Sequence, residues 1–190
     1  MAFVTNGAGD VISFAEYTDV VQTDQRLFEE NRIVIPEESG FATIQDFIED
    51  ILEKSTSRIL LKLKASSWWL NYNAYVNNYV SDINNLPSVN ANLIDPNNLQ
   101  DRRSQFTTLC VSHALKESIL PLIAEFTEDS PDIAKIQFYD KKFNDLYQEL
   151  ISLADWYDYD NSGTVEADEK LTTFFRTRRT RRRASIVKVR

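Results

Sequence analysis

An acidic stretch of twelve residues, 158–169, is the feature that most constrains how this chain can fold. It reads Asp-Tyr-Asp-Asn-Ser-Gly-Thr-Val-Glu-Ala-Asp-Glu, with side-chain oxygens at its positions 1, 3, 5, 9 and 12. Position 6 is Gly163, which permits the sharp left-handed turn that brings the two halves of the stretch together. The spacing therefore predicts a loop around one hard divalent cation, an ion that takes about six to eight oxygen ligands.

The stretch has the EF-hand pattern, in which a calcium loop joins two helices. The candidate Ca²⁺ ligands are the side chains of Asp158, Asp160 and Ser162, the backbone carbonyl of Thr164, Glu166 directly or through a water, and the bidentate carboxylate of Glu169. Apolar residues flank the loop, with Leu150, Leu153, Ala154 and Tyr157 before it and Leu171, Phe174 and Phe175 after it. The alternative is an acidic turn between two helices that needs the glycine only for its geometry.

The composition is that of a folded protein with one sizeable core. Hydrophobic residues make up 43% of the 190 residues, and only four glycines and five prolines argue against an all-β chain. The single cysteine, Cys110, excludes an internal disulfide and fits a reducing compartment. The sequence has neither a run of about 18 apolar residues nor a signal-peptide pattern, so we expect no membrane span and synthesis in a cytoplasm.

The net charge of -8 hides an uneven distribution along the chain. Residues 170–190 contain nine Lys or Arg and no acid, whereas the preceding 169 residues hold 12 bases and 29 acids, a balance of -17. An acidic body with a basic tail predicts two different contacts, or a tail that docks on a neighbouring copy. The candidate partner-binding residues are Arg176, Arg178, Arg179, Arg181, Arg182, Arg183, Lys188 and Arg190. A solvated, disordered tail is the alternative.

Hydrophobic periodicity predicts an all-α fold, a bundle of three to four long helices with an extended loop, an EF-hand-like helix-loop-helix and an extended C-terminal tail. We expect an N-terminal arm over residues 1–12, a helical domain over 13–169, and a short helix with a basic docking tail over 170–190. Ser13 is the expected cap of a first helix that continues, with a break, to Phe28.

Three long helices are expected in the middle of the chain. Thr43 starts an amphipathic helix over residues 43–65. A second helix starts near Gln100, and Pro121 should kink or restart it because proline lacks an amide donor. The pair Ser130-Pro131 starts a third helix that runs directly into the acidic loop.

Between the first two long helices lies a long polar segment. Residues 71–99 hold ten asparagines and two prolines, which predicts a long loop. Such a loop is usually functional or an assembly surface, and a tolerated insertion is the alternative. Trp68 and Trp69 precede it, and because neighbours in a helix cannot share one face, we expect one in the core and the other against a neighbouring copy or another loop.

The sequence predicts no enzyme. The only histidine, His113, lies on the apolar side of its helix, where a core or boundary position is the simpler interpretation than a metal ligand. Cys110 is one turn earlier, but a Cys–His nucleophile on a helix interior would lack oxyanion donors. A glycine-rich phosphate loop is also missing, and scattered carboxylates are common on any acidic surface.

The order of elements resembles that of the head-to-tail connector (adaptor or neck) proteins of tailed bacteriophages. The similarity rests on Leu52-Glu-Lys-Ser-Thr-Ser-Arg-Ile-Leu followed by Trp68-Trp69, on the helix that begins Asp101-Arg-Arg, on the helix with Lys135-Ile-Gln-Phe-Tyr-Asp-Lys-Lys-Phe, and on Trp156-Tyr-Asp-Tyr-Asp-Asn-Ser-Gly-Thr-Val. It covers about residues 40–190. The resemblance implies a virion protein that forms a homo-oligomeric ring, commonly of twelve copies. Such a ring contacts the portal protein and the next neck or tail protein, and DNA passes through its lumen without sequence-specific binding.

Two other functions remain open at the level of the sequence. One is a calcium sensor or buffer, although EF-hands normally pair through position 8, here Val165, and the sequence has no second loop. The other is a nucleic-acid-binding module that uses the Arg-rich tail. That tail lacks interleaved aromatic residues and the body is acidic, so its binding would be non-specific and weak in salt. In the connector interpretation, Ca²⁺ is structural and stiffens the corner before the tail.

Overall fold

The computed structural model describes residues 3–28, 32–37, 40–70, 94–124, 130–158 and 163–165. The chain divides into two units, one made of Met1–Leu61 and Arg102–Glu149, the other of Lys62–Asp101 and Leu150–Arg190. The elements are, in order, β1 (Val4–Thr5), β2 (Val11–Ser13), α1 (Tyr17–Thr23), the 3₁₀ turn η1 (Gln25–Leu27), α2 (Ile44–Lys64), the 3₁₀ segment η4 (Pro96–Arg102), α4 (Arg103–Ala114), the π-helical segment η5 (Leu115–Ile119), α5 (Leu120–Ile123) and α6 (Pro131–Leu153). Most of the described residues are helical, as expected for a mainly α protein.

The first unit begins with a β-hairpin inside the segment expected as an N-terminal arm. Val4 pairs with Ser13 and Thr5 with Val11 in an antiparallel ladder that contains a bulge. The side-chain oxygen of Asn6 closes the loop, because it accepts hydrogen bonds from the amides of Ala8 and Asp10, each at 2.9 Å. The hairpin carries the chain into the core at Phe14, which is fully buried.

Helix α1 begins three residues later than Ser13 would place it. The Ser13 hydroxyl contacts its own neighbour instead, donating to the carbonyl of Ala15 at 2.8 Å. The helix is capped at Glu16, whose amide donates to the Asp19 carboxylate at 2.9 Å. The expectation that Ser13 caps the helix was therefore wrong, since the serine side chain closes a local turn.

Helix α2 confirms the amphipathic helix expected over residues 43–65. The Thr43 hydroxyl accepts a hydrogen bond from the Asp46 amide at 3.1 Å, so threonine caps the first turn. Ile48, Leu52 and Ile59 are all at most 1% exposed, as the helical spacing of apolar residues predicts.

The second long helix consists of α4, η5 and α5. It begins near the expected residue, with η4 leading into it from Pro96. The expected disturbance at Pro121 takes the form of the π-helical turn η5 directly before it, and the backbone leaves the helix at Ala124. Proline cannot donate the amide hydrogen bond of a regular α-turn, and a wider turn accommodates that loss.

Helix α6 starts at the expected signal. The Ser130 hydroxyl accepts a hydrogen bond from the Asp132 amide at 3.3 Å, and Pro131 is the first helical residue. The helix ends at Leu153, earlier than the sequence predicts, and Ala154 has a φ of 55°. This left-handed residue is the common way to terminate a helix, although glycine usually occupies it.

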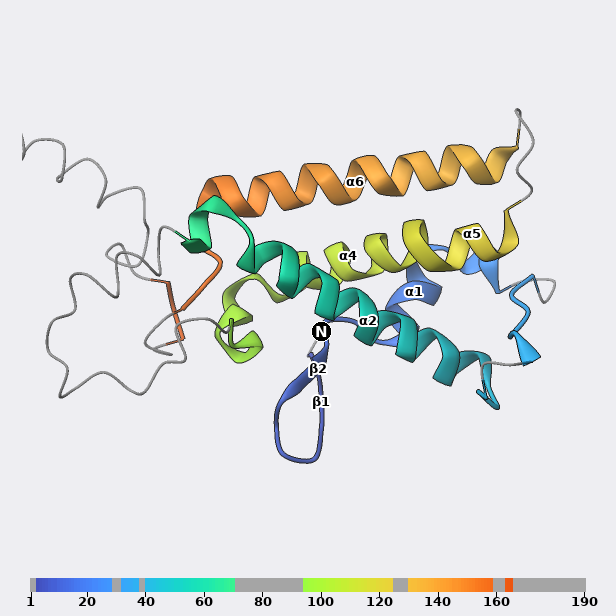
Figure 1. Cartoon of the computed structure of the whole chain (residues 1–190), viewed down its shortest axis with the longest axis horizontal. Coiled ribbons are helices and arrows are strands. Elements are labelled where there is room, and N and C mark those ends of the chain that lie inside the picture. The colour runs from blue at the N-terminus through green and yellow to red at the C-terminus, as the bar shows by residue number, and fades with distance from the viewer. Residues whose placement is uncertain are drawn as a thin grey trace, which may run out of the picture. The chain divides into compact units, whose positions relative to one another are not determined.

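Within the first unit, α4 lies between α2 and α6 (Figure 1). It contacts α2 where the Thr56 hydroxyl lies 3.4 Å from the Cys110 sulfur. It contacts α6 where the ring of His113 meets the ring of Phe143 edge to face, with centroids 5.3 Å apart. Phe14 from the hairpin side packs on Phe106 of α4 at 5.3 Å, so the aromatic core joins all these elements.

The second unit contains an aromatic cluster. Trp68 and Trp69 lie in a helical turn over residues 67–70, and both are buried. Both pack against Trp156, with ring centroids at 4.5 Å for Trp68 and 6.3 Å for Trp69. Trp156 lies in the non-helical segment 154–158 after α6, so the expected packing of a tryptophan on another loop is met, and both tryptophans rather than one take part in it. Residues 71–93 of the asparagine-rich loop, and 166–190 with the short helix and the tail, lie outside the described residues.

Candidate metal-binding corner

The described part of the acidic loop centres on Asp158, five residues beyond the end of α6. Its side chain is 4% exposed. Its carboxylate accepts a hydrogen bond from the amide of Gly163 at 2.8 Å, and its own amide donates to the carbonyl of Asn98 at 3.0 Å. These two bonds hold the start of the loop at both its side chain and its backbone.

Gly163 has the left-handed backbone that the sequence predicts, with a φ of 93°. A side chain in that conformation is strained, whereas glycine adopts it freely. The turn carries the Gly163 amide back to the carboxylate at position 1 of the loop. This hydrogen bond offsets part of the cost of burying the Asp158 side chain.

The aromatic cluster fixes the position of Asp158. Trp156 and Tyr157 directly precede it and are buried, at 0% and 4% exposure. The ring of Tyr157 meets the ring of Trp69 edge to face at 5.0 Å, and its hydroxyl lies 3.5 Å from the side-chain nitrogen of Asn98. The candidate ligand Asp158 therefore follows directly on residues that are packed in the aromatic cluster.

Asn98 is a residue that sequence reasoning missed. It lies 60 positions before Asp158 and was assigned to the polar loop over 71–99. In the structure it belongs to η4, and it contributes a backbone carbonyl to the corner. Every residue has a backbone carbonyl, so no pattern of residue types in the sequence predicts this contact.

Of the six candidate Ca²⁺ ligands, the structure describes two. Asp158 and Thr164 stand on the two sides of the Gly163 turn. The remaining four candidates, Asp160, Ser162, Glu166 and Glu169, lie outside the described residues. Over the described ranges, no group of three or more His, Cys, Asp or Glu side chains could hold a metal ion. Ca²⁺ binding stays a prediction, with the position-1 carboxylate and the position-6 glycine in a geometry that suits it.

The candidate partner-binding residues of the tail also lie outside the described residues. They are Arg176, Arg178, Arg179, Arg181, Arg182, Arg183, Lys188 and Arg190. Their role stays a prediction based on charge.

Cys110 and His113 take part in a buried polar contact between α2 and α4. Burial raises the pKa of the Cys110 thiol from 9.0 to about 12, although a hydrogen bond with Thr56 acts in the opposite direction. Nδ1 of His113 lies 3.2 Å from the hydroxyl of Ser55. A thiol with so high a pKa carries its proton at neutral pH, so Cys110 is a poor nucleophile in the folded protein.

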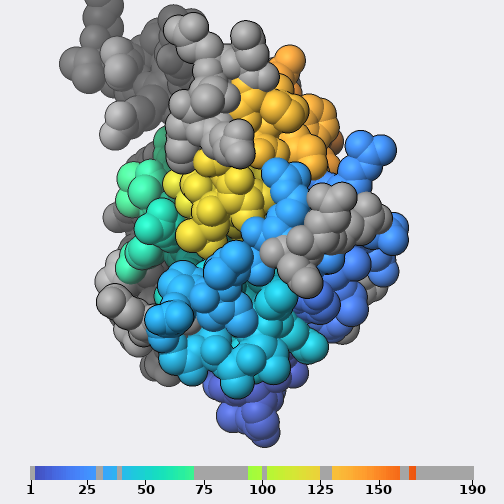
Figure 2. All heavy atoms as spheres, turned by 90° about the vertical axis from the view of Figure 1, so that its right-hand side faces the viewer, coloured from blue at the N-terminus to red at the C-terminus, as the bar shows by residue number. Residues whose placement is uncertain are grey.

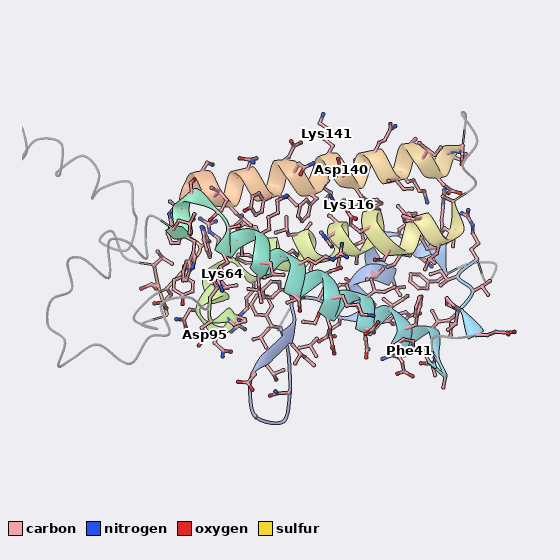
Figure 3. The ribbon with its side chains drawn as sticks, viewed as in Figure 1. Phe41, Lys64, Asp95, Lys116, Asp140 and Lys141 are labelled. Carbon is pink, nitrogen blue, oxygen red and sulfur yellow. The ribbon has the colours of Figure 1, made fainter. Side chains whose placement is uncertain are left out.

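Lys116 of η5 joins the second and third long helices by charge. Its ammonium group lies 2.7 Å from a carboxylate oxygen of Asp140 on α6 and 3.4 Å from one of Glu117 (Figure 3). It also lies 4.4 Å from the centre of the Phe143 ring. The Lys116 side chain is only 10% exposed, so it combines an ion pair with a cation–π contact at the edge of the core.

Comparisons with protein-family models, with curated proteins and with solved structures found no match for this chain. Among the helices that the structure describes, none is long and apolar enough to cross a membrane. The class that these observations define is a mainly α-helical protein with an acidic body.

Proposed function

We propose that this protein is a structural component of the neck of a tailed-phage virion. Copies of it form a homo-oligomeric ring that joins the portal to the tail and lets DNA pass. The observation that carries the proposal is the separation of charge along one chain, with -17 on residues 1–169 and nine bases without an acid on 170–190. Opposite charges on two parts of one chain favour assembly of its copies.

The helical core supports this proposal as a rigid building block. We infer that α2, the continuous run α4–η5–α5, and α6 form the bundle of long helices of a connector subunit. Phe106 and Leu109 on the second helix and Phe143 on the third are at most 2% exposed. Two ion pairs, Lys135–Asp24 at 2.8 Å and Arg32–Asp132 at 3.0 Å, tie the start of α6 to the chain before α2.

The acidic body suits a channel for DNA. Proteins hold DNA mainly through Lys and Arg contacts to phosphates, so a wall with few exposed bases would bind the duplex weakly. A body with 29 acids against 12 bases would repel the duplex and leave it free to pass. The basic tail is then reserved for protein partners, either the portal or a neighbouring subunit.

Calcium has a structural part in this proposal. Asp158 and Thr164, with Asp160, Ser162, Glu166 and Glu169, would hold the ion. A bound Ca²⁺ would supply a fixed positive charge that draws these oxygens together. The loop would then be stiffened next to the packed residues Trp156 and Tyr157.

Calorimetric titration with Ca²⁺ tests the metal site. We expect the wild-type protein to bind the ion, and Glu169→Gln to bind it at least about ten-fold more weakly, because the variant loses a bidentate carboxylate. Asp145→Asn is the matched control, since Asp145 is an exposed acid on α6. Identical heats for the wild type and Glu169→Gln would remove Ca²⁺ from the proposal.

Assembly with the portal tests the function itself. The purified protein is mixed with portal rings of its own phage, and the masses of the complexes are measured by mass photometry. We expect a complex with a ring of this protein, and no such complex after deletion of residues 176–190. Circular dichroism of the deletion variant should show unchanged helical content. A virion whose portal vertex carries no ring of this protein would end the proposal.

A further inference from the structure

A groove opens on the first unit between the hairpin, the start of α1 and one stripe of α2. It encloses about 220 Å³. Its ten lining residues are Val4, Ile12, Ser13, Ala15, Glu16, Tyr17, Thr18, Gln45, Glu49 and Glu53. Figure 2 shows this side of the unit, with the dark-blue hairpin projecting below the cyan start of α2.

The α2 side of the groove is a straight acidic stripe. Gln45, Glu49 and Glu53 are spaced four residues apart, so they lie one above another on the same helix face. The Gln45 amide donates to the Glu49 carboxylate at 2.8 Å, which orders the stripe. The opposite rim carries a third acid, Glu16, within 3.5 Å of the Thr18 hydroxyl.

The rest of the lining is apolar apart from the hydroxyls of Ser13 and Thr18. Ile12 is 37% exposed, so it presents apolar surface to the groove. Val4 and Tyr17 are half-buried beside it. Among the residues that line the groove, three are carboxylates and none is Lys, Arg or His. The chemistry that fits such a surface is an extended peptide that alternates basic and apolar side chains.

We propose that this groove binds the C-terminal segment 176–190 of a second copy of this chain. That segment holds eight Lys or Arg and ends in Ile186-Val-Lys-Val-Arg, where apolar and basic residues alternate. Its arginines suit the glutamate carboxylates, and its Ile and Val side chains suit the apolar side formed by Val4 and Ile12. The inference rests on the proposed ring, because it names the surface by which one subunit holds the next.

A tail that enters the neighbour's groove makes a head-to-tail contact. Contacts of this kind join two different surfaces, and they close into a ring when the rotation between copies permits. A contact between two identical patches would stop at a dimer. The groove and the tail are therefore the pair of unlike surfaces that a ring of this chain requires.

Photo-cross-linking of the full-length protein tests the inference. Thr18 is exposed and lines the groove, so p-benzoylphenylalanine is placed there. Equal amounts of isotopically heavy and light protein are mixed under the conditions of ring assembly and irradiated. We expect cross-links from position 18 to residues 176–190, with about half of them joining a heavy to a light copy, the ratio for random exchange between neighbours.

Charge variants separate a specific contact from general attraction. Glu49→Gln combined with Glu53→Gln should lower the yield of tail cross-links roughly five-fold, because two ion pairs at the rim are lost. Glu37→Gln combined with Asp145→Asn removes two exposed acids outside the groove and should leave the yield unchanged. Circular dichroism of both double variants checks that the helices persist.

The outcomes distinguish this inference from the proposed function. Suppose that rings form on the portal but the cross-links join only residues within one copy, the portal, or other segments. That result would overturn the groove contact and leave the proposed connector function standing. Heavy-to-light cross-links to the tail without rings would support the groove contact and overturn the connector. Equal loss of yield in both double variants would overturn the groove as the specific acceptor.

Discussion

At the scale of single residues, the corner at Asp158 depends on the backbone of Gly163. The carboxylate is 4% exposed and receives the amide of Gly163 at 2.8 Å, a bond that exists only because the chain turns left-handed there. The position of this glycine in the twelve-residue pattern predicted the turn. The pattern could not predict Asn98 or the stacked tryptophans that support the aspartate, because these residues come from distant parts of the chain.

Gly163→Ala measures what this backbone conformation contributes. An added Cβ would meet no atom within 4 Å, so any loss of stability comes from the φ of 93° alone. We expect a loss of about 1 kcal/mol, the cost of a left-handed conformation for alanine. Urea unfolding followed by tryptophan fluorescence measures it. Gly7→Ala is the control, because its site is equally open and its φ is not left-handed; equal losses in both variants would contradict the strain argument.

The buried thiol of Cys110 makes stability depend on alkaline pH. Its pKa is 9.0 in an unfolded chain and about 12 in the folded protein. Between these values the unfolded chain loses the proton and the folded protein keeps it, so stability is full below pH 9 and falls as the pH rises. The slope from this group is about 1.4 kcal/mol per pH unit.

Urea unfolding at about pH 8 and about pH 10 checks this slope. The wild type should lose about 1.4 kcal/mol more than Cys110→Ala over that range, because alanine cannot titrate. Burial also raises the pKa values of Tyr139 and Tyr147, but these tyrosines are present in both proteins and cancel in the difference. The same pH dependence in both proteins would mean that the thiol is already exposed to solvent.

At the scale of elements, local signals located the helices and tertiary contacts set their ends. Thr43 and Ser130 predicted the starts of α2 and α6 because an N-cap acts within its own turn. The end of α6 at Leu153 and the start of α1 at Tyr17 were missed. Ala154 takes a left-handed conformation that ends α6, and Ser13 closes a local turn with Ala15 instead of capping α1. The groove between the hairpin and α2 left no signal, since its lining comes from three separate stretches of the chain.

The cap of α2 offers a test at this scale. Thr43→Ala removes the hydroxyl that accepts the Asp46 amide at 3.1 Å, and we expect a loss of about 1 kcal/mol. Ser57→Ala is the matched control, because Ser57 is exposed in the middle of the same helix and alanine is the better helix former. Thermal unfolding should show a lower midpoint for Thr43→Ala and an equal or higher one for Ser57→Ala. A loss in both would point to a general effect of removing hydroxyls.

At the scale of the whole molecule, the distribution of charge along the chain is the property that the sequence alone predicts most directly. The balance of -17 over residues 1–169 and the nine bases after it can be counted without a structure. The sequence alone could not predict which of these acidic residues lie together on one surface. The structure brings Glu16 together with Glu49 and Glu53 around one groove, although the sequence separates them by more than 30 positions. This groove is the surface that we propose as the acceptor of the tail.

Two sets of substitutions in the tail separate the contribution of its positive charge from that of the guanidinium geometry. Replacing Arg176, Arg178, Arg179, Arg181, Arg182 and Arg183 by lysine keeps six positive charges but removes the planar guanidinium fork. Replacing the same six by glutamine removes the charge as well. We expect the lysine variant to assemble with roughly ten-fold weaker affinity, since a bidentate carboxylate contact becomes a single point charge. The glutamine variant should not assemble at any salt concentration.

Mass photometry of both variants against the wild type, over a range of salt, gives the measurement. The wild-type assembly should weaken as salt rises, because salt screens the attraction between exposed charges, and the screening length falls to about 10 Å at 0.1 M salt. If the glutamine variant assembled as well as the wild type, the six arginines would be solvated, and the acidic groove would need another partner. If lysine and arginine behaved alike, attraction between net charges would suffice and the groove would select its partner by sign alone.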